Sequence, residues 1–218
     1  MPRYRNSGQR NSRRRVPMWA LVVAFAVVIG DRALTGQPAS AQKPPAVAGT
    51  LPGDVANERA RVLDALFMSL KAAASDGEAE VIVAEIWQVW MRSGRPEVDR
   101  ILNEGVGYMA LRQLGPAHDR FTEALEAAPD FAEAWNKRAT VLYLMNEHDR
   151  SLADIEKVMA LEPRHFGALA GRATIHAHAG RWKEALTAFR LALAANPFLK
   201  ERETVLPDLE RRVEGDRL

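Results

Sequence analysis

Five histidines are the residues of this chain best suited to bind a metal ion or transfer a proton. His176 and His178 are the closest pair, but two residues apart on a helix their side chains diverge by about 200° and cannot bind one metal ion together. We expect His176 to face the core and His178 to face a binding groove. His118, His148 and His165 fall near predicted turns, so we expect them at the surface.

The carboxylates and the remaining motifs do not indicate catalysis either. Asp130 and Glu133 have the spacing of a capping box ahead of Trp135, which is a structural role. The sequence has no glycine-rich phosphate loop and no cysteine, which excludes disulfides, thiolate metal sites and cysteine nucleophiles. We therefore predict a non-enzymatic protein with no metal, no cofactor and no small-molecule substrate.

Three prolines mark repeating segments in the second half of the chain. Pro129, Pro163 and Pro197 stand 34 residues apart, a period typical of stacked helical hairpins. Large and small residues recur ahead of each proline at spacings of three and four, so they share one helix stripe and allow close packing. The recurring positions are Ile101, Trp135 and Leu169; Gly105, Ala139 and Ala173; Ala117, Ser151 and Ala185; Phe121, Ile155 and Phe189; and Ala124, Val158 and Ala192.

A tight turn is predicted midway through each repeat. The residues at this position are Arg112, Asn146 and Gly180. Glycine and asparagine readily adopt the left-handed backbone conformation that ends a helix, whereas Arg112 departs from this preference. Each repeat is therefore predicted to consist of two helices.

The pattern resembles the tetratricopeptide repeat (TPR) family over residues 98–197. The resemblance implies an all-α fold, a right-handed α-solenoid of three hairpins at 98–131, 132–165 and 166–197. Leu142 and His176 replace a usual tyrosine and Ser151 replaces a usual alanine, and each fits a tight helix interface. The motif residues are Gly105, Tyr108, Ala117, Phe121, Ala124 and Pro129; Trp135 and Pro163; and Gly180, Ala185, Phe189, Ala192 and Pro197.

Members of this family hold extended or helical peptides in a concave groove, which implies a partner-binding surface on the first helix of each repeat. We expect Asn136 to contact backbone amides of the partner, and Tyr143 and Met109 to pack against it. The surface lacks the Lys, Arg and Asn cluster that binds carboxylate tails of cytosolic heat-shock chaperones, so that partner is not expected. The predicted groove residues are Leu102, Asn103, Val106, Met109, Asn136, Lys137, Thr140, Tyr143, Thr174 and His178.

A charged column recurs where family members often have leucine. It consists of Glu104, Arg138 and Arg172. We favour a structural role, with arginine stems covering apolar surface and Glu104 pairing with Arg138. Recognition of an anion is the alternative.

The N-terminal 41 residues have the features of a secretory signal. Six arginines precede an apolar run at 16–29, and Ala39-Ser40-Ala41 ahead of Gln42 has the form of a signal-peptidase site. The apolar run is too short to span a bilayer comfortably. We predict a periplasmic or exported protein, with an uncleaved inner-membrane anchor as the alternative.

Removal of this segment would reverse the net charge. The whole chain carries +2, but residues 1–41 hold seven Arg and one Asp, which leaves 23 basic and 27 acidic residues, or −4. A mildly acidic chain is a poor nucleic-acid binder, so no nucleic-acid partner is expected. Residues 42–54, rich in Pro, Ala and Gly, are predicted to be a flexible linker.

Two further helical units flank the repeats. Residues 55–94 are predicted to form a hairpin that caps the N-terminal end of the array, with Trp87 and Trp90 in its core rather than in a ligand clamp. Residues 198–218 are predicted to form a C-terminal capping helix, with Leu199, Val205 and Leu209 on the last repeat and a split or bend at Pro207.

These features together predict an adaptor that binds a protein or peptide segment in the bacterial cell envelope. The alternative is a membrane-anchored assembly factor that organises a complex at the inner-membrane surface. The membrane takes part only if the N-terminal segment stays uncleaved.

Overall fold

The structure is a computed structural model that describes residues 53–215. The predicted signal segment 1–41, nearly all of the predicted linker and residues 216–218 lie outside the described residues. Every regular element within 53–215 is a helix, and none of these helices is long and apolar enough to cross a membrane.

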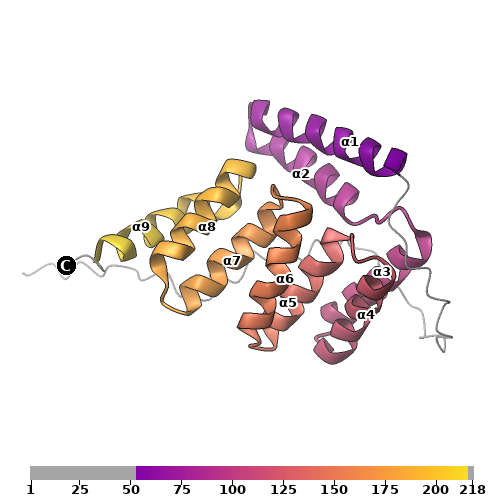
Figure 1. Cartoon of the computed structure of the whole chain (residues 1–218). Helices are drawn as coiled ribbons and strands as arrows, with labels where there is room; N and C mark the ends of the chain where they lie inside the picture. Colours follow the sequence, from indigo (N-terminus) through magenta and orange to yellow (C-terminus); the bar gives the residue numbers. More distant parts are fainter. Residues whose placement is uncertain (1–52, 216–218) are drawn as a thin grey trace, which may run out of the picture.

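The helices follow one another as antiparallel hairpins (Figure 1). Pro96 begins α3 in the first turn, where its missing N–H costs no hydrogen bond. The elements are α1 (Gly53–Ala72), α2 (Asp76–Trp90), α3 (Pro96–Ala110), α4 (Leu114–Ala127), α5 (Ala132–Leu144), α6 (His148–Leu161), α7 (Phe166–His178), α8 (Trp182–Ala195), the 3₁₀ turn η2 (Lys200–Glu203) and α9 (Val205–Gly215).

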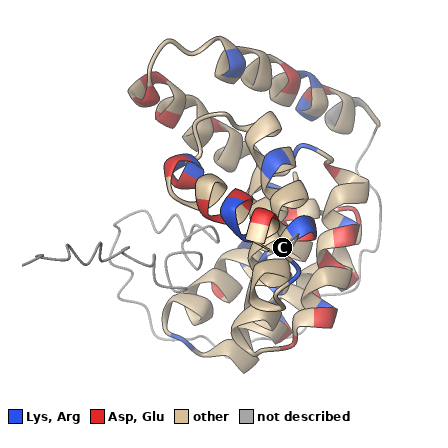
Figure 2. Ribbon diagram, turned by 90° about the vertical axis from the view of Figure 1, so that its left-hand side faces the viewer, with Lys and Arg blue, Asp and Glu red and all other residues tan. Residues whose placement is uncertain are grey.

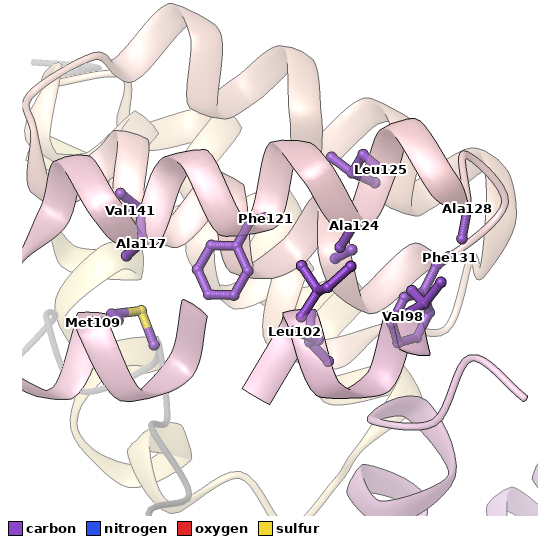
Figure 3. Packing of buried hydrophobic residues seen from close by; sticks show 12 residues of the cluster. Val98, Leu102, Met109, Ala117, Phe121, Ala124, Leu125, Ala128, Phe131 and Val141 are labelled. Atoms are coloured by element: carbon purple, nitrogen blue, oxygen red, sulfur yellow. The ribbon is translucent and has the colours of Figure 1, made fainter. Parts of the chain in front are cut away.

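The recurring small and large positions form the hairpin interfaces, as predicted. A Cβ on Gly105 would lie 2.5 Å from Cε1 of Phe121, so only glycine allows α3 and α4 to approach this closely. Figure 3 shows Phe121 between Ala117 and Ala124 in the core of this hairpin. In the next hairpin Ser151 donates a hydrogen bond of 2.7 Å to the Ala139 carbonyl, which satisfies its buried hydroxyl. The all-helical fold of packed hairpins is therefore confirmed.

The turn column adopts the predicted left-handed backbone at all three positions. The φ angles are 60° at Arg112, 61° at Asn146 and 71° at Gly180. Arg112 is the least favourable of the three residues, because a non-glycine side chain in the left-handed backbone region raises the free energy of the folded state. Tertiary packing of α3 on α4 overrides the local preference of this residue.

Replacing Arg112 with glycine is expected to raise the free energy of unfolding by about 0.5 to 1 kcal/mol. The Arg112 side chain is exposed, so the change removes backbone strain without removing buried contacts. Urea unfolding followed by circular dichroism measures the difference. Gly180→Ala is the matched control and should lower stability, because no atom crowds its Cβ position and only the positive φ opposes alanine.

The N-terminal hairpin does not cap the array, and this prediction was wrong. The α1–α2 hairpin lies along the edge where the repeats connect, across the ends of several helices (Figure 1). Trp87 and Trp90 pack there against Phe166 at the start of α7 and near Ala195 at the end of α8. Both tryptophans are core residues, as predicted, and the buried face of the hairpin extends to the third repeat.

The C-terminal helix covers α8, as predicted. Val205, Leu209 and Val213 of α9 are buried against Ala185, Phe189 and their neighbours. The break in this segment falls at Thr204, between η2 and α9, and not at Pro207, where a split or bend was predicted. Pro207 lies in the first turn of α9, where it requires no bend because its absent N–H has no helical partner.

Candidate functional site

The predicted groove residues differ widely in their accessibility. Asn103 is exposed, and Val106 and His178 are half-buried. The other seven are buried side chains of α3, α5 and α7. They therefore support the inner face of these helices but offer little surface for contact with a partner. The buried members are Leu102, Met109, Asn136, Lys137, Thr140, Tyr143 and Thr174.

Asn136 and Lys137 belong to a buried polar cluster centred on Glu133. The Glu133 carboxylate accepts a hydrogen bond of 3.1 Å from the Asn136 amide and pairs with the Lys137 ammonium at 3.0 Å. The same ammonium lies 5.3 Å from the Trp87 ring centroid, under the N-terminal hairpin. The Asn136 amide nitrogen thus donates within the protein, and the expected contact of Asn136 with a partner backbone stays a prediction.

His165 completes this cluster, which corrects two sequence predictions. The ring is fully buried and not at the surface, and its Nε2 lies 2.9 Å from Glu133 Oε2. Its Nδ1 accepts the backbone N–H of Ala168, so neutral His165 carries its proton on Nε2 and donates it to Glu133. Asp130 and Glu133 form no capping box, because Glu133 points inward and Asp130 pairs with Arg95.

The acidity of Glu133 makes stability depend on pH. Burial alone would raise the pKa of Glu133, but the Lys137 charge and the His165 hydrogen bond outweigh burial and hold it at about 2, below the usual 4.5. As pH falls, the Glu133 carboxylate is protonated in the unfolded chain at a higher pH than in the folded chain. The stabilisation is therefore complete above pH 4.5 and is lost as pH falls towards 2.

We expect this loss to reach about 3 kcal/mol for the Glu133 carboxyl group. The measurement is urea unfolding of the wild type and of Glu133→Gln at pH 5 and at pH 2. Stability of the wild type should fall further than that of the variant by about this amount. Equal losses would contradict the assignment, because Glu133→Gln lacks the titrating group and keeps all other acids.

Three rings from different helices meet near the ends of α5 and α7. The Tyr143 hydroxyl lies 3.3 Å from the ring nitrogens of His178, and the Tyr143 and His148 rings stack at 5.4 Å between centroids. Burial lowers the pKa of His178, and the neighbouring His148 lowers it further. This ring cluster brings together two predicted groove residues and leaves the His178 edge half-exposed.

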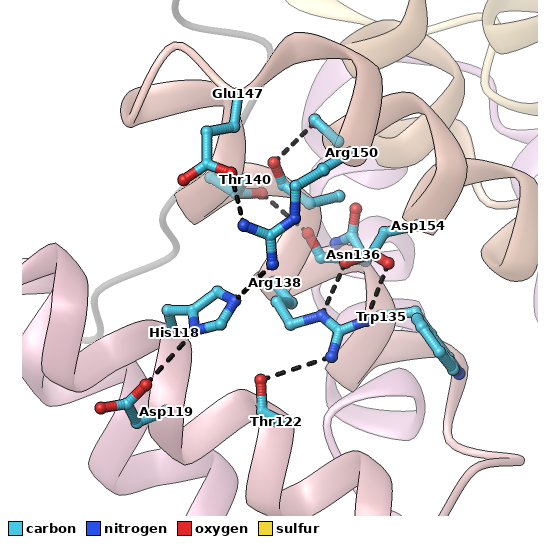
Figure 4. Close-up of polar contacts among 12 residues, drawn as sticks. His118, Asp119, Thr122, Trp135, Asn136, Arg138, Thr140, Glu147, Arg150 and Asp154 are labelled. Atoms are coloured by element: carbon cyan, nitrogen blue, oxygen red, sulfur yellow. Dashed lines mark hydrogen bonds and ion pairs between the residues drawn. The ribbon is translucent and has the colours of Figure 1, made fainter.

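The side chains of the charged column Glu104, Arg138 and Arg172 form ion pairs within the protein, which is the structural role that we favoured. Their partners differ from the predicted pairing of Glu104 with Arg138. Arg138 donates two hydrogen bonds to Asp154 at 2.8 and 2.9 Å and a third to Thr122 at 3.3 Å (Figure 4). Its guanidinium also lies 4.7 Å from the Trp135 ring centroid. Glu104 pairs with arginines of its own hairpin instead of Arg138. Arg138 therefore ties α5 to both α4 and α6.

Replacing Arg138 with methionine is expected to lower the free energy of unfolding by about 2 kcal/mol, because Asp154 is left buried without its bidentate partner. Thermal and urea unfolding measure the loss. The double change Arg138→Met and Asp154→Leu should recover part of it. An unchanged melting temperature combined with lost partner binding would instead support anion recognition.

Candidate metal ligands and the distribution of charge are the remaining chemical features of the described helices. No group of three or more His, Asp or Glu side chains within residues 53–215 could hold a metal ion. Acidic and basic positions are interspersed along the helices in Figure 2, with no broad basic face in view.

Comparison with known proteins identifies the family of the repeats. A family model described as tetratricopeptide repeat matches residues 102–158 and 137–199. A TPR repeat-containing protein of Rhizobium etli is 33% identical over 155 residues, which covers 71% of this chain and 76% of that protein. DnaJ homolog subfamily C member 3 of Mus musculus is 30% identical over 122 residues, covering 56% of this chain but 24% of that relative.

Solved structures of similar fold are TPR domains. The Sgt2 TPR domain from Aspergillus fumigatus has a TM-score of 0.53 at 23% identity and covers 56% of this chain and 83% of that one. The Arabidopsis OM64 TPR domain has a TM-score of 0.51 at 22% identity, covering 53% and 96%. The hairpin geometry, the repeat columns and the match along most of the R. etli protein lead to one assignment: this chain belongs to the tetratricopeptide repeat family.

Proposed function

We propose that this protein is a non-enzymatic adaptor that binds a segment of a partner protein on the inner face of α3, α5 and α7. TPR domains are generally protein interaction modules, and one solved relative of similar fold is described as the TPR2B domain of yeast Sti1 in complex with an Hsp70 peptide. The observation that carries the proposal is the ring cluster of Tyr143, His148 and His178. Rings with polar edges are well suited to pack on a peptide and hydrogen-bond to it.

The accessible residues of this face define where contact should occur. Asn103 is exposed on α3, and Val106 and His178 are half-buried on α3 and α7. The buried threonines hydrogen-bond within their helices, as Thr140 does to the Asn136 carbonyl at 2.9 Å. The partner should therefore contact the edges of the ring cluster and the part of the inner face formed by Asn103 and Val106 of α3.

Site-specific photocrosslinking tests this surface. A photoreactive residue at Asn103 or His178 is expected to capture one protein, which mass spectrometry then identifies. The matched control is the same residue at Glu126, which is exposed on α4 of the same hairpin as Asn103. Equal capture at Glu126 would contradict the inner-face proposal, and capture of the chain itself would indicate self-association.

We also propose that the adaptor works in the cell envelope. The support is the arginine-rich start, the apolar run and the Ala39-Ser40-Ala41 sequence, all outside the described residues. Mass determination of the mature protein is expected to give an N-terminus at Gln42. An intact chain in the membrane fraction would instead favour the anchored assembly factor.

A further inference from the structure

A groove beside α1 of the N-terminal hairpin is lined by residues of α1, α6, α7 and α8. Its volume is about 710 Å³, and Pro163 and Arg164, from the segment between α6 and α7, also line it. Its lining is mostly apolar, and two residues at its mouth are unusually exposed: Met68 at 71% and Leu191 at 51%. Exposed apolar side chains beside a groove are typical of a surface that a partner covers. We call this surface the α1–α8 groove.

The walls of the α1–α8 groove have helical spacing. Phe67, Met68 and Lys71 line it from α1 at spacings of three and four, and Leu191 and Ala195 line it four residues apart on α8. Both helices thus present one stripe along the groove. Leu169 of α7 and Met159 of α6 also line the groove. A groove lined by side chains at helical spacing on two helices is suited to receive a third helix.

The charged residues that line the groove indicate which charge a bound helix should carry. Arg164 pairs with Asp64 and with Glu162 at 2.9 Å, and Arg172 pairs with Glu156 at 3.1 Å. Lys71 lies in the last turn of α1 and makes no ion pair with another residue of the described chain. The cation left without a counter-charge favours a carboxylate on whatever occupies the groove.

We infer that the α1–α8 groove binds an amphipathic helix of a partner protein, with an apolar stripe facing Met68 and Leu191 and an acidic residue facing Lys71. This site is separate from the inner face of α3, α5 and α7. A chain that binds a second segment here could connect two proteins, or hold one partner at two points and gain affinity through linkage.

Two designed peptides test the inference on the full chain. Both have 16 residues and the same leucine stripe at i, i+3, i+4 and i+7, and they differ only in flanking glutamates or flanking lysines. Fluorescence anisotropy is expected to show saturable binding of the glutamate peptide, about five-fold or more tighter than that of the lysine peptide. Lys71→Met should reduce this preference.

Variants of the groove decide where the peptide binds. Met68→Glu and Leu191→Glu should each weaken binding about ten-fold or more, and both positions are exposed enough to leave the fold intact. Leu111→Glu is the matched control, because Leu111 is 70% exposed but lies at the end of α3. Absent binding, a lack of preference for glutamate, or binding unaffected by Leu191→Glu would overturn the inference.

A second copy of the chain is the competing occupant. Sedimentation that shows a dimer lost in Leu191→Glu would place a second copy in the groove and overturn the partner-helix inference. Photocrosslinking from His178 detects a partner only on the inner face of α3, α5 and α7, and not in the α1–α8 groove. A negative result at the α1–α8 groove therefore leaves the proposed adaptor function unaffected.

Discussion

Replacing Glu133 with glutamine is expected to lower the free energy of unfolding at pH 7 by about 4 kcal/mol. Glu133 is fully buried and is the counter-charge of Lys137, whose side chain is also buried. Glutamine is nearly isosteric and its carbonyl can still accept from His165, but it leaves the ammonium of Lys137 without a negative partner. Urea unfolding followed by circular dichroism measures the change.

A second variant separates the lost charge pair from any loss of shape. Glu133→Gln combined with Lys137→Met removes both charges and should recover at least half of the lost stability, since breaking a buried pair costs more than replacing it. Glu126→Gln on the surface of α4 is the matched control and should stay within about 0.5 kcal/mol of the wild type. A loss below about 1 kcal/mol in Glu133→Gln would show that Lys137 reaches water or another partner.

The repeats could be predicted from the sequence because their determinants are local. Gly105 and Phe121 are sixteen positions apart on the two helices of one hairpin, and the same pair of columns recurs at Ala139 and Ile155. A fixed period reveals such contacts without knowledge of the tertiary structure. Arg112 also adopts the left-handed turn conformation, although arginine has a low local preference for it. The helix packing that the 34-residue period predicts holds it there.

The position of the N-terminal hairpin could not be predicted in this way. The apolar faces of α1 and α2 indicate that another part of the protein must cover this hairpin. They do not indicate which part. That choice depends on long-range contacts such as Trp87 on Phe166, and no repeat column relates these two residues. The general preference for a cap at the end of an array therefore gave the wrong answer.

The Glu133 cluster escaped prediction for a related reason. Glu133 and His165 belong to different repeats, and their hydrogen bond forms only because α5 and α7 start side by side beneath the hairpin. One signal was present in the sequence. His165 occupies the column of Phe131 and Leu199, so a polar residue stands where the other repeats have an apolar one. A buried polar residue in such a column requires a partner.

Replacing Trp90 with alanine is expected to cost about 4 kcal/mol and to release the α1–α2 hairpin from the repeats. The Trp90 ring is fully buried and stacks on His165 at 4.0 Å between centroids, with planes 11° apart. It also contacts Phe166 at 4.9 Å, so one side chain joins the hairpin to both the polar cluster and the third repeat. Urea unfolding measures the loss of stability.

Amide hydrogen exchange shows where the Trp90→Ala loss is located. The ion pair that joins Asp64 of the hairpin to Arg164 of the repeats is exposed and contributes little, so it should not hold the hairpin in place. Protection should fall in α1 and α2 first and persist in α5 and α6. Val81→Ala on the exposed side of α2 is the matched control and should change stability by less than about 0.5 kcal/mol. Equal loss of protection in every helix would show that hairpin and repeats unfold as one unit, and that the hairpin is an integral part of the array.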